Sequence, residues 1–193
     1  GGGDTSALST ISDMTGTGIV ISDSTASVSL NLLTITNDAG VATGLLLDDS
    51  GSPGTSDPSL TLTNSTLTGT ADNWTGISVN LTNDGTIDIS DTLFTGTTGS
   101  DQVGIALVVD GGGTDTPTAA LALDDNTISL GGVTPLAISL SASNGGLVNP
   151  LSGLGNLATD GTIDLTGSEL FDANGTDASI SGSLEVNSET VFP

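Results

Sequence analysis

Residues 59–69 read SLTLTNSTLTG, and the fold prediction starts from this stretch. Leu60 and Leu62 alternate with threonine, a short polar run follows, and Leu67 precedes a threonine and a glycine. Successive side chains of a strand point to opposite sides, so an apolar residue at every second position indicates a strand with one buried face. Asn64 tolerates the left-handed backbone of a sharp turn. The stretch therefore predicts short strands joined by a tight bend.

The same spacing of three apolar residues occurs six times, with starts 21 to 42 residues apart. The six units are Val28/Leu30/Ile35, Leu60/Leu62/Leu67, Ile87/Ile89/Phe94, Leu121/Leu123/Ile128, Ile163/Leu165/Leu170 and Leu184/Val186/Val191. A repeat of this length is typical of a solenoid, in which each unit buries its apolar face by stacking on its neighbours. This regular placement argues against disorder, which the many Gly, Ser, Thr and Asp residues would otherwise favour.

Ahead of four units lies a second apolar strand that begins with glycine. The four strands are GIVI (18–21), GLLL (44–47), GISV (76–79) and GIAL (104–107), and Pro135–Leu140 is a fifth copy. Asparagine or aspartate recurs between the second and third apolar positions, at Asn31, Asn64, Asp91, Asp124–Asn126 and Asn187. Three short strands with a bend at these polar residues account for the length of a unit.

Three phrases resemble the Gly/Thr/Asn-rich repeats of large bacterial surface proteins and autotransporter passengers. They are WTGISVNL (Trp74–Leu81), GTIDISDTLFTG (Gly85–Gly96) and LSGLGNLATDG (Leu151–Gly161). The chain is similar in this way to the pectate-lyase-like superfamily from roughly residue 18 to residue 193. The resemblance implies an all-β, right-handed parallel β-helix, a β-solenoid of about six coils.

An antiparallel β-sandwich is the alternative fold, because the strands of hairpins would alternate apolar and polar residues equally well. The chain has 193 residues, which suits one sizeable domain. We therefore expect a single domain over 1–193, with an N-terminal lead or junction segment at 1–17 and a terminal coil at 184–193. The first residue is Gly1 and not Met, which suggests a processed product or an excised piece.

All charged side chains are acidic: Asp and Glu number 23, Lys, Arg and His are absent, and the net charge is −23. Without a cation to bind phosphate, nucleic-acid binding is excluded as a function. An anionic membrane surface would repel the chain, and no apolar run approaches the roughly 18 residues of a membrane-spanning helix. Cysteine is also absent, which is compatible with an extracellular location.

Catalysis is not expected. The resemblance implies a lyase chemistry that uses Arg or Lys with bound calcium, and this chain has neither cation. Hydrolysis of a glycoside needs two carboxyl groups in different environments, and the pairs Asp48/Asp49, Asp88/Asp91 and Asp124/Asp125 are candidates. Adjacent residues of a strand point to opposite faces, so such pairs are not ready-made dyads. A carbohydrate-active enzyme or glycan-binding β-helix module remains the alternative function.

Calcium is the one cofactor that the sequence suggests, because acidic turns beside glycine offer oxygen ligands. Weak candidates for ligands are Asp84, Asp88, Asp110 and Asp115. The segment DGGGTD (110–115) departs from the known calcium nonapeptide pattern and does not recur. Solvated turn aspartates are the favoured interpretation, so no cofactor is expected.

Outward threonines and N-glycosylation tripeptides are two further surface features of the sequence. Outward threonines such as Thr61, Thr63, Thr34 and Thr36 suggest ice binding, but the aligned positions Asp88, Ala122 and Asp164 interrupt the row, and β-propensity explains the threonines. Four tripeptides match the N-glycosylation pattern, at Asn64, Asn73, Asn80 and Asn174. Trp74 is expected to be a loop or core anchor.

We therefore expect an extracellular, cell-surface structural protein, a fibre, stalk or adhesin segment. A solenoid ends in open strand edges that pair with any matching edge unless they are covered. The expected partner is the chain itself, as a head-to-tail homopolymer joined through Gly1–Ile11 and Leu184–Pro193, with surface glycans as a further partner. Inside the solenoid, Leu62, Ile89, Leu123 and Leu165 are expected to form one column.

Overall fold

The chain forms three parallel β-sheets, which we name A, B and C. The computed structural model describes residues 9–22, 25–37, 43–49, 57–96, 101–112, 116–130, 136–152, 158–159, 162–166, 184–186 and 189–192. Sheet A contains β1 (Ser9–Met14), β4 (Leu33–Asn37), β7 (Thr66–Gly69), β10 (Leu93–Gly96), β13 (Thr127–Leu130) and β16 (Ala158–Thr159). Sheet B contains β2 (Ile19–Ser22), β5 (Thr43–Asp49), β8 (Thr75–Leu81), β11 (Val103–Asp110), β14 (Leu136–Ser143) and β17 (Thr162–Thr166). Sheet C contains β3 (Ser27–Asn31), β6 (Ser59–Thr63), β9 (Gly85–Ser90), β12 (Thr118–Asp124) and β15 (Leu147–Ser152).

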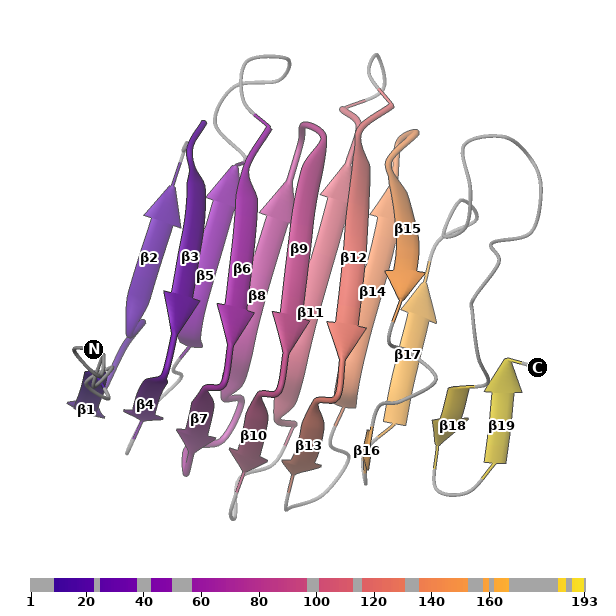
Figure 1. Cartoon of the computed structure of the whole chain (residues 1–193). Helices are drawn as coiled ribbons and strands as arrows, with labels where there is room; N and C mark the ends of the chain where they lie inside the picture. The colour runs from indigo at the N-terminus through magenta and orange to yellow at the C-terminus, as the bar shows by residue number, and fades with distance from the viewer. Residues whose placement is uncertain are drawn as a thin grey trace, which may run out of the picture.

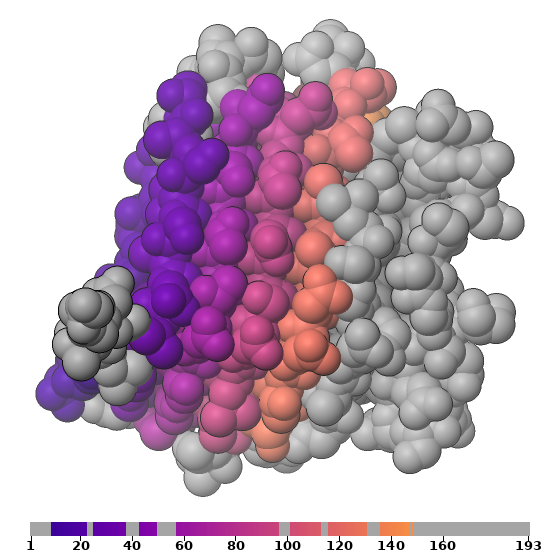
Figure 2. Space-filling model, viewed as in Figure 1, coloured from indigo at the N-terminus to yellow at the C-terminus, as the bar shows by residue number. Residues whose placement is uncertain are grey.

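The chain visits sheets A, B and C in that order, again and again, and each strand pairs in parallel with its counterpart one turn later. Figure 1 shows the resulting stack of strands, and in Figure 2 successive turns of the chain lie side by side as bands from indigo to orange. This arrangement is that of a parallel β-solenoid and confirms the all-β prediction. The antiparallel alternative is wrong for these three sheets.

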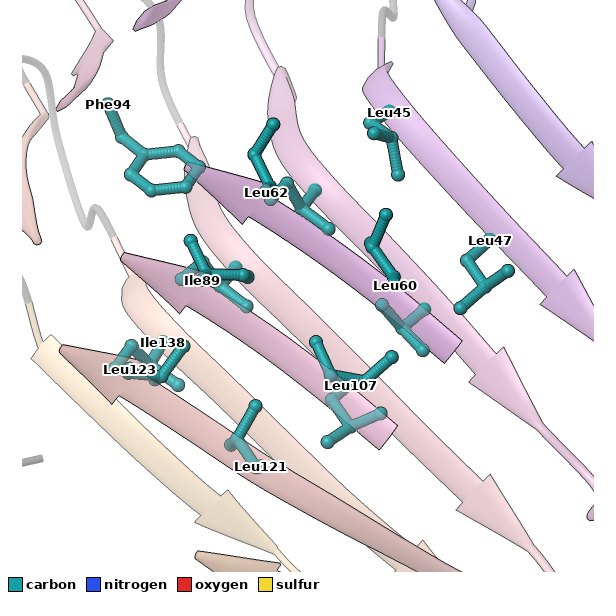
Figure 3. Close-up of a cluster of buried hydrophobic side chains, with 14 of the residues drawn as sticks. Leu45, Leu47, Leu60, Leu62, Ile89, Phe94, Leu107, Leu121, Leu123 and Ile138 are labelled. Atoms are coloured by element: carbon teal, nitrogen blue, oxygen red, sulfur yellow. The ribbon is translucent and has the colours of Figure 1, made fainter. Parts of the chain in front are cut away.

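The core lies between the sheets. It is built from columns in which equivalent inward side chains of successive strands stack on one another. In sheet C, Leu62 pairs with Ile89 and Ile89 with Leu123, so these three residues stack in one column as expected. All three are fully buried and belong to the core cluster that Figure 3 shows. Leu165 is not in this column. It belongs to β17 of sheet B, where it pairs with Leu140.

The bend from sheet C to sheet A uses one left-handed residue per turn. This residue has a positive φ at Leu32, Asn64, Asp91 and Asp125. The bend was therefore predicted correctly in three turns, but in the first turn it falls on Leu32 and not on Asn31, which ends β3. Asn187 lies outside the described residues. Backbone hydrogen bonds join the bends of neighbouring turns, from Asn64 N to Ser90 O at 3.2 Å, for example.

Polar side chains fill the inside of this corner directly after the bend. Ser65, Thr92 and Asn126 are buried, and each bonds to the backbone. The Ser65 hydroxyl donates to the carbonyl of Thr63 at 2.7 Å and accepts from the Leu33 amide at 3.1 Å. The Asn126 amide donates to the Ile89 carbonyl at 2.7 Å. These bonds satisfy backbone groups that the sharp bend leaves without a sheet partner.

Close packing explains the glycine at the start of the sheet B strands. A Cβ built on Gly44, Gly76 or Gly104 would lie 2.5 to 2.6 Å from the carbonyl oxygen of the equivalent residue in the next turn. The same Cβ would also contact a buried side chain of sheet A, which for Gly76 is Phe94. The column ends at Ala137, and there the pairing with β17 shifts in register. The glycines are therefore needed wherever the next turn repeats the same backbone path.

Three boundaries expected from the sequence are corrected. Part of the lead segment 1–17 is the first strand of sheet A, because Ser9–Met14 pairs with β4. Ile163 and Leu165 are in a sheet B strand, so they do not start a unit of the Leu60/Leu62/Leu67 type. The segment 184–193 does not form a parallel coil: β18 (Leu184–Val186) and β19 (Glu189–Phe192) pair with each other as an antiparallel hairpin.

Candidate functional surfaces

Sheets A and C present different outer faces. On sheet C the outward column through Thr61 continues to Asp88 and Ala122, and the column through Thr63 continues to Ser90 and Asp124. The outer face of sheet C therefore carries a mixture of hydroxyl, carboxylate and methyl groups. The expected interruption of the row at Asp88 and Ala122 is confirmed for sheet C, whereas Asp164 belongs to sheet B, where it pairs with Ser139.

The outer face of sheet A is more uniform. One outward column contains Thr10, Thr34, Thr66, Leu93 and Thr127, and the second contains Thr36, Thr68, Thr95 and Ser129. The inward residues between them, such as Ile35 and Phe94, are fully buried. Thr34 and Thr36 therefore do not share a row with Thr61 and Thr63, the other outward threonines named from the sequence. The two threonine pairs lie on different sheets.

The calcium candidates do not come together in the part of the chain that is described. No group of three His, Cys, Asp or Glu side chains there is placed to hold a metal ion. Asp84 accepts a hydrogen bond from the Thr118 amide at 2.8 Å, which ties two successive loops together. Asp88 points outward from β9. Asp115 lies outside the described residues.

Asp110 is held by two hydrogen bonds at the end of β11. Its Oδ1 accepts from the Asn144 side-chain amide at 2.8 Å and from the Gly112 backbone amide at 3.1 Å. These bonds favour the carboxylate, and the bond from Asn144, as the larger effect, together with that from Gly112, holds the pKa of Asp110 below its ordinary value. The arrangement joins two successive turns of the chain.

The candidate carboxylate pair Asp48/Asp49 is separated by the strand geometry, whereas Asp91 and Asp125 of the other two pairs are bend residues. Asp48 and Asp49 point to opposite faces of β5, with Asp49 buried and Asp48 partly exposed, as predicted. The buried Asp49 accepts a 2.6 Å hydrogen bond from the side-chain amide of Asn83, and its carbonyl accepts from the Thr82 hydroxyl at 2.6 Å. These contacts connect β5 to the end of β8.

The sequence did not predict a buried polar line at the corner between sheets A and B, which consists of the side chains of Asn37, Trp74 and Gln102. Trp74 is fully buried, and its Nε1 donates to Asn37 Oδ1 at 3.2 Å. Asn37 in turn donates to the Gly16 carbonyl at 3.1 Å, and Gln102 donates to the Ala71 carbonyl at 2.9 Å. The indole lies over Gly69, where a Cβ would be 2.1 Å from the ring. Trp74 is therefore a core anchor, which is one of the two roles expected from the sequence.

The N-terminal end of the stack is open within the described part of the chain. Strands β1, β2 and β3 each stand at the edge of their sheet, and only one neighbour pairs with each. The inward apolar residues of these strands pack against the core but stay partly exposed; they are Ile11, Ile19, Ile21, Val28 and Leu30. Val20 on the same end is 58% exposed. Such an edge is a template for pairing with another strand.

Comparisons with known proteins find no matching protein-family model, no matching curated protein and no matching solved structure. Across the described residues, no helix has the length and apolar character of a membrane span.

Proposed function

We propose that this chain is a non-catalytic structural protein of the cell exterior, a right-handed solenoid of about six coils whose copies join end to end. The observation that carries the proposal is the open N-terminal end. Three strand edges are unpaired there among the described residues, and partly exposed isoleucines and leucine lie beneath them. The absence of Cys is compatible with an extracellular location.

The strands at the two ends of the stack could pair with each other in a second copy of the chain. Strands β15, β16 and β17 stand at the opposite ends of the sheets that begin with β3, β1 and β2. A second copy in the same orientation would continue all three parallel ladders and cover the partly exposed apolar residues. A head-to-tail contact of this kind repeats without closing unless its rotation makes a ring, so it produces a filament. The hairpin β18–β19 takes no place in the three ladders.

A pair of variants on β2 tests the proposal. Ile21 points inward and Val20 outward on the same four-residue strand. Ile21→Asp would place a charge in the proposed junction, whereas Val20→Asp would place the same charge on the outer face. We expect wild-type protein to grow with concentration in light scattering and Ile21→Asp to remain monomeric, while Val20→Asp still assembles.

Circular dichroism controls for folding, and Val28→Asp on β3 is a second junction variant should Ile21→Asp fail to fold. A wild-type chain that stays monomeric at high concentration would contradict the proposal. Equal assembly of the Ile21→Asp and Val20→Asp variants would also contradict it.

A further inference from the structure

The outer face of sheet A is a regular array of hydroxyl groups. Nine outward positions of β1, β4, β7, β10 and β13 lie in register, and all except Leu93 carry a hydroxyl; they are Thr10, Thr34, Thr66, Leu93, Thr127, Thr36, Thr68, Thr95 and Ser129. Parallel pairing in register places equivalent residues of successive strands directly beside each other. The array therefore repeats along the stack and across the strands.

Three hydroxyls in the middle of this array, those of Thr36, Thr68 and Thr95, are available to an external partner. On sheet C the Thr63 hydroxyl donates to Asn31 at 3.0 Å, and at the corner the Thr92 hydroxyl donates to the Ser90 carbonyl at 2.9 Å. Within the described residues no such bond uses the hydroxyls of Thr36, Thr68 and Thr95. Threonine is stiff at χ1, so each hydroxyl and methyl group of the array has few orientations to choose from.

The nine array positions are also uncharged, although the exposed Asp13 lies on β1 where its pairing with β4 shifts in register. None of the nine positions is acidic, although the chain has 23 carboxylates and the other two sheets present Asp48, Asp88 and Asp124 on their outer sides. The acidic bend residues Asp91 and Asp125 border the face but do not lie on it. A carboxylate keeps a strong hydration shell of its own, and removing that shell is costly. An uncharged, hydrogen-bonding and regular face therefore fits an uncharged and regular partner.

The spacing of the array favours water in its crystalline form. Strands repeat about 4.8 Å apart, and outward residues on one strand about 6.6 Å apart. In ice, each oxygen is bonded tetrahedrally to neighbours about 2.75 Å away, which puts second neighbours about 4.5 Å apart and the layer repeat at about 7.4 Å. Both spacings of the protein lie within about a tenth of those of ice.

A solid polysaccharide is the competing partner with an uncharged, regular surface. Binding sites of that kind use exposed aromatic rings, but Trp74 and Phe94 in the described core are both fully buried. We propose that the outer face of sheet A, from Thr10 to Ser129, is an ice-binding surface. The inference does not depend on self-assembly, because a single chain presents the whole array.

Two matched variants test the surface. Thr68 on β7 and Thr61 on β6 are both outward and partly buried, and each can be changed to lysine with the same change in charge. We expect wild-type protein to be taken up into slowly growing ice and Thr68→Lys to be rejected like an inert protein. Thr61→Lys should be taken up as the wild type is. Leu93→Thr, which completes the first column, should raise the fraction taken up.

Far-UV circular dichroism near 0 °C checks that the variants are folded, and Thr95→Lys serves as a second sheet A variant. Rejection of the wild-type protein from ice would overturn the proposal. Equal losses for Thr68→Lys and Thr61→Lys would overturn it too, because the face of sheet A would then have no special part. Sedimentation of the wild type with crystalline cellulose or chitin, without uptake into ice, would assign the face to a polysaccharide instead.

Discussion

The middle of the stack and its N-terminal end have the same residue pattern but different environments. Leu62 in β6 and Leu30 in β3 occupy paired positions of sheet C, one turn apart. Leu62 is fully buried, whereas Leu30 is only partly buried because, among the described strands, β3 is paired on one edge alone. Burial in this fold is therefore a property of the neighbouring turns and not of the strand itself, as expected of a repeat protein.

The largest difference between the two regions should come from truncating these paired leucines. Leu62→Ala leaves a cavity that is closed on all sides and should lower the free energy of unfolding by about 2–5 kcal/mol. Leu30→Ala should cost clearly less, because part of the leucine already contacts water. Urea denaturation of both variants measures the difference, and equal losses would mean that the N-terminal end is covered in solution.

A smaller difference in stability between the two regions is expected when a glycine of each is changed to alanine. In Gly76→Ala the new Cβ would lie 2.5 Å from the Gly104 carbonyl oxygen and 2.7 Å from Phe94, so two turns of backbone must separate. We expect a loss of about 1–3 kcal/mol in the free energy of unfolding. Gly16→Ala near the N-terminal end is the control, since its Cβ would meet nothing within 4 Å. If thermal melting shows the two variants equally stable, the close approach of the turns at Gly76 is not real.

The buried polar line of the A–B corner should make a contribution of similar size. Trp74→Phe removes the indole N–H and leaves the buried Oδ1 of Asn37 without that donor. An unsatisfied buried acceptor costs about 1–3 kcal/mol, and a smaller ring also loses some packing over Gly69. Trp74→Phe combined with Asn37→Ala should lose less than the sum of the two single changes. Strict additivity in this double-mutant cycle, measured by urea denaturation, would show that the two side chains do not interact.

The smallest effect is expected for the pH dependence of stability that comes from Asp110 at the end of β11. Hydrogen bonds from Asn144 and Gly112 lower the pKa of Asp110 in the folded state. The unfolded chain then takes up this proton first, so the stabilisation is complete above the usual aspartate pKa of about 3.9 and is lost as pH falls below it. Asp110→Asn should show a weaker fall in melting temperature between about pH 5 and pH 2 than the wild type. An unchanged pH profile in that variant would exclude a contribution from Asp110.

Much of the fold could be predicted from local pattern, because a strand with one buried face must alternate. The alternation of Leu60, Leu62 and Leu67 identified the strands, and Asn64 identified the bend between them. The glycine before Ile77 marked the start of a sheet B strand. Each of these features depends on a few adjacent residues and on backbone sterics.

The candidate surfaces could be predicted much less well, because they depend on which turns lie next to each other. The sequence alignment named Thr34 and Thr61 together as outward threonines without assigning them to sheets, and the structure shows the first on sheet A and the second on sheet C. The alignment also placed Leu165 with Leu123, although β17 follows β14 in sheet B. The spacing between units varies with loop length, so counting residues cannot assign a strand to its sheet.

By itself, the sequence determined that this chain is built from short, repeated strands without cationic side chains, since alternation and composition are local properties. Only the tertiary structure decided which residues share a column. Register between turns is set by the packing of glycine against carbonyl and of leucine against leucine, across more than twenty residues of chain. The threonine face of sheet A and the open N-terminal end are both consequences of that packing.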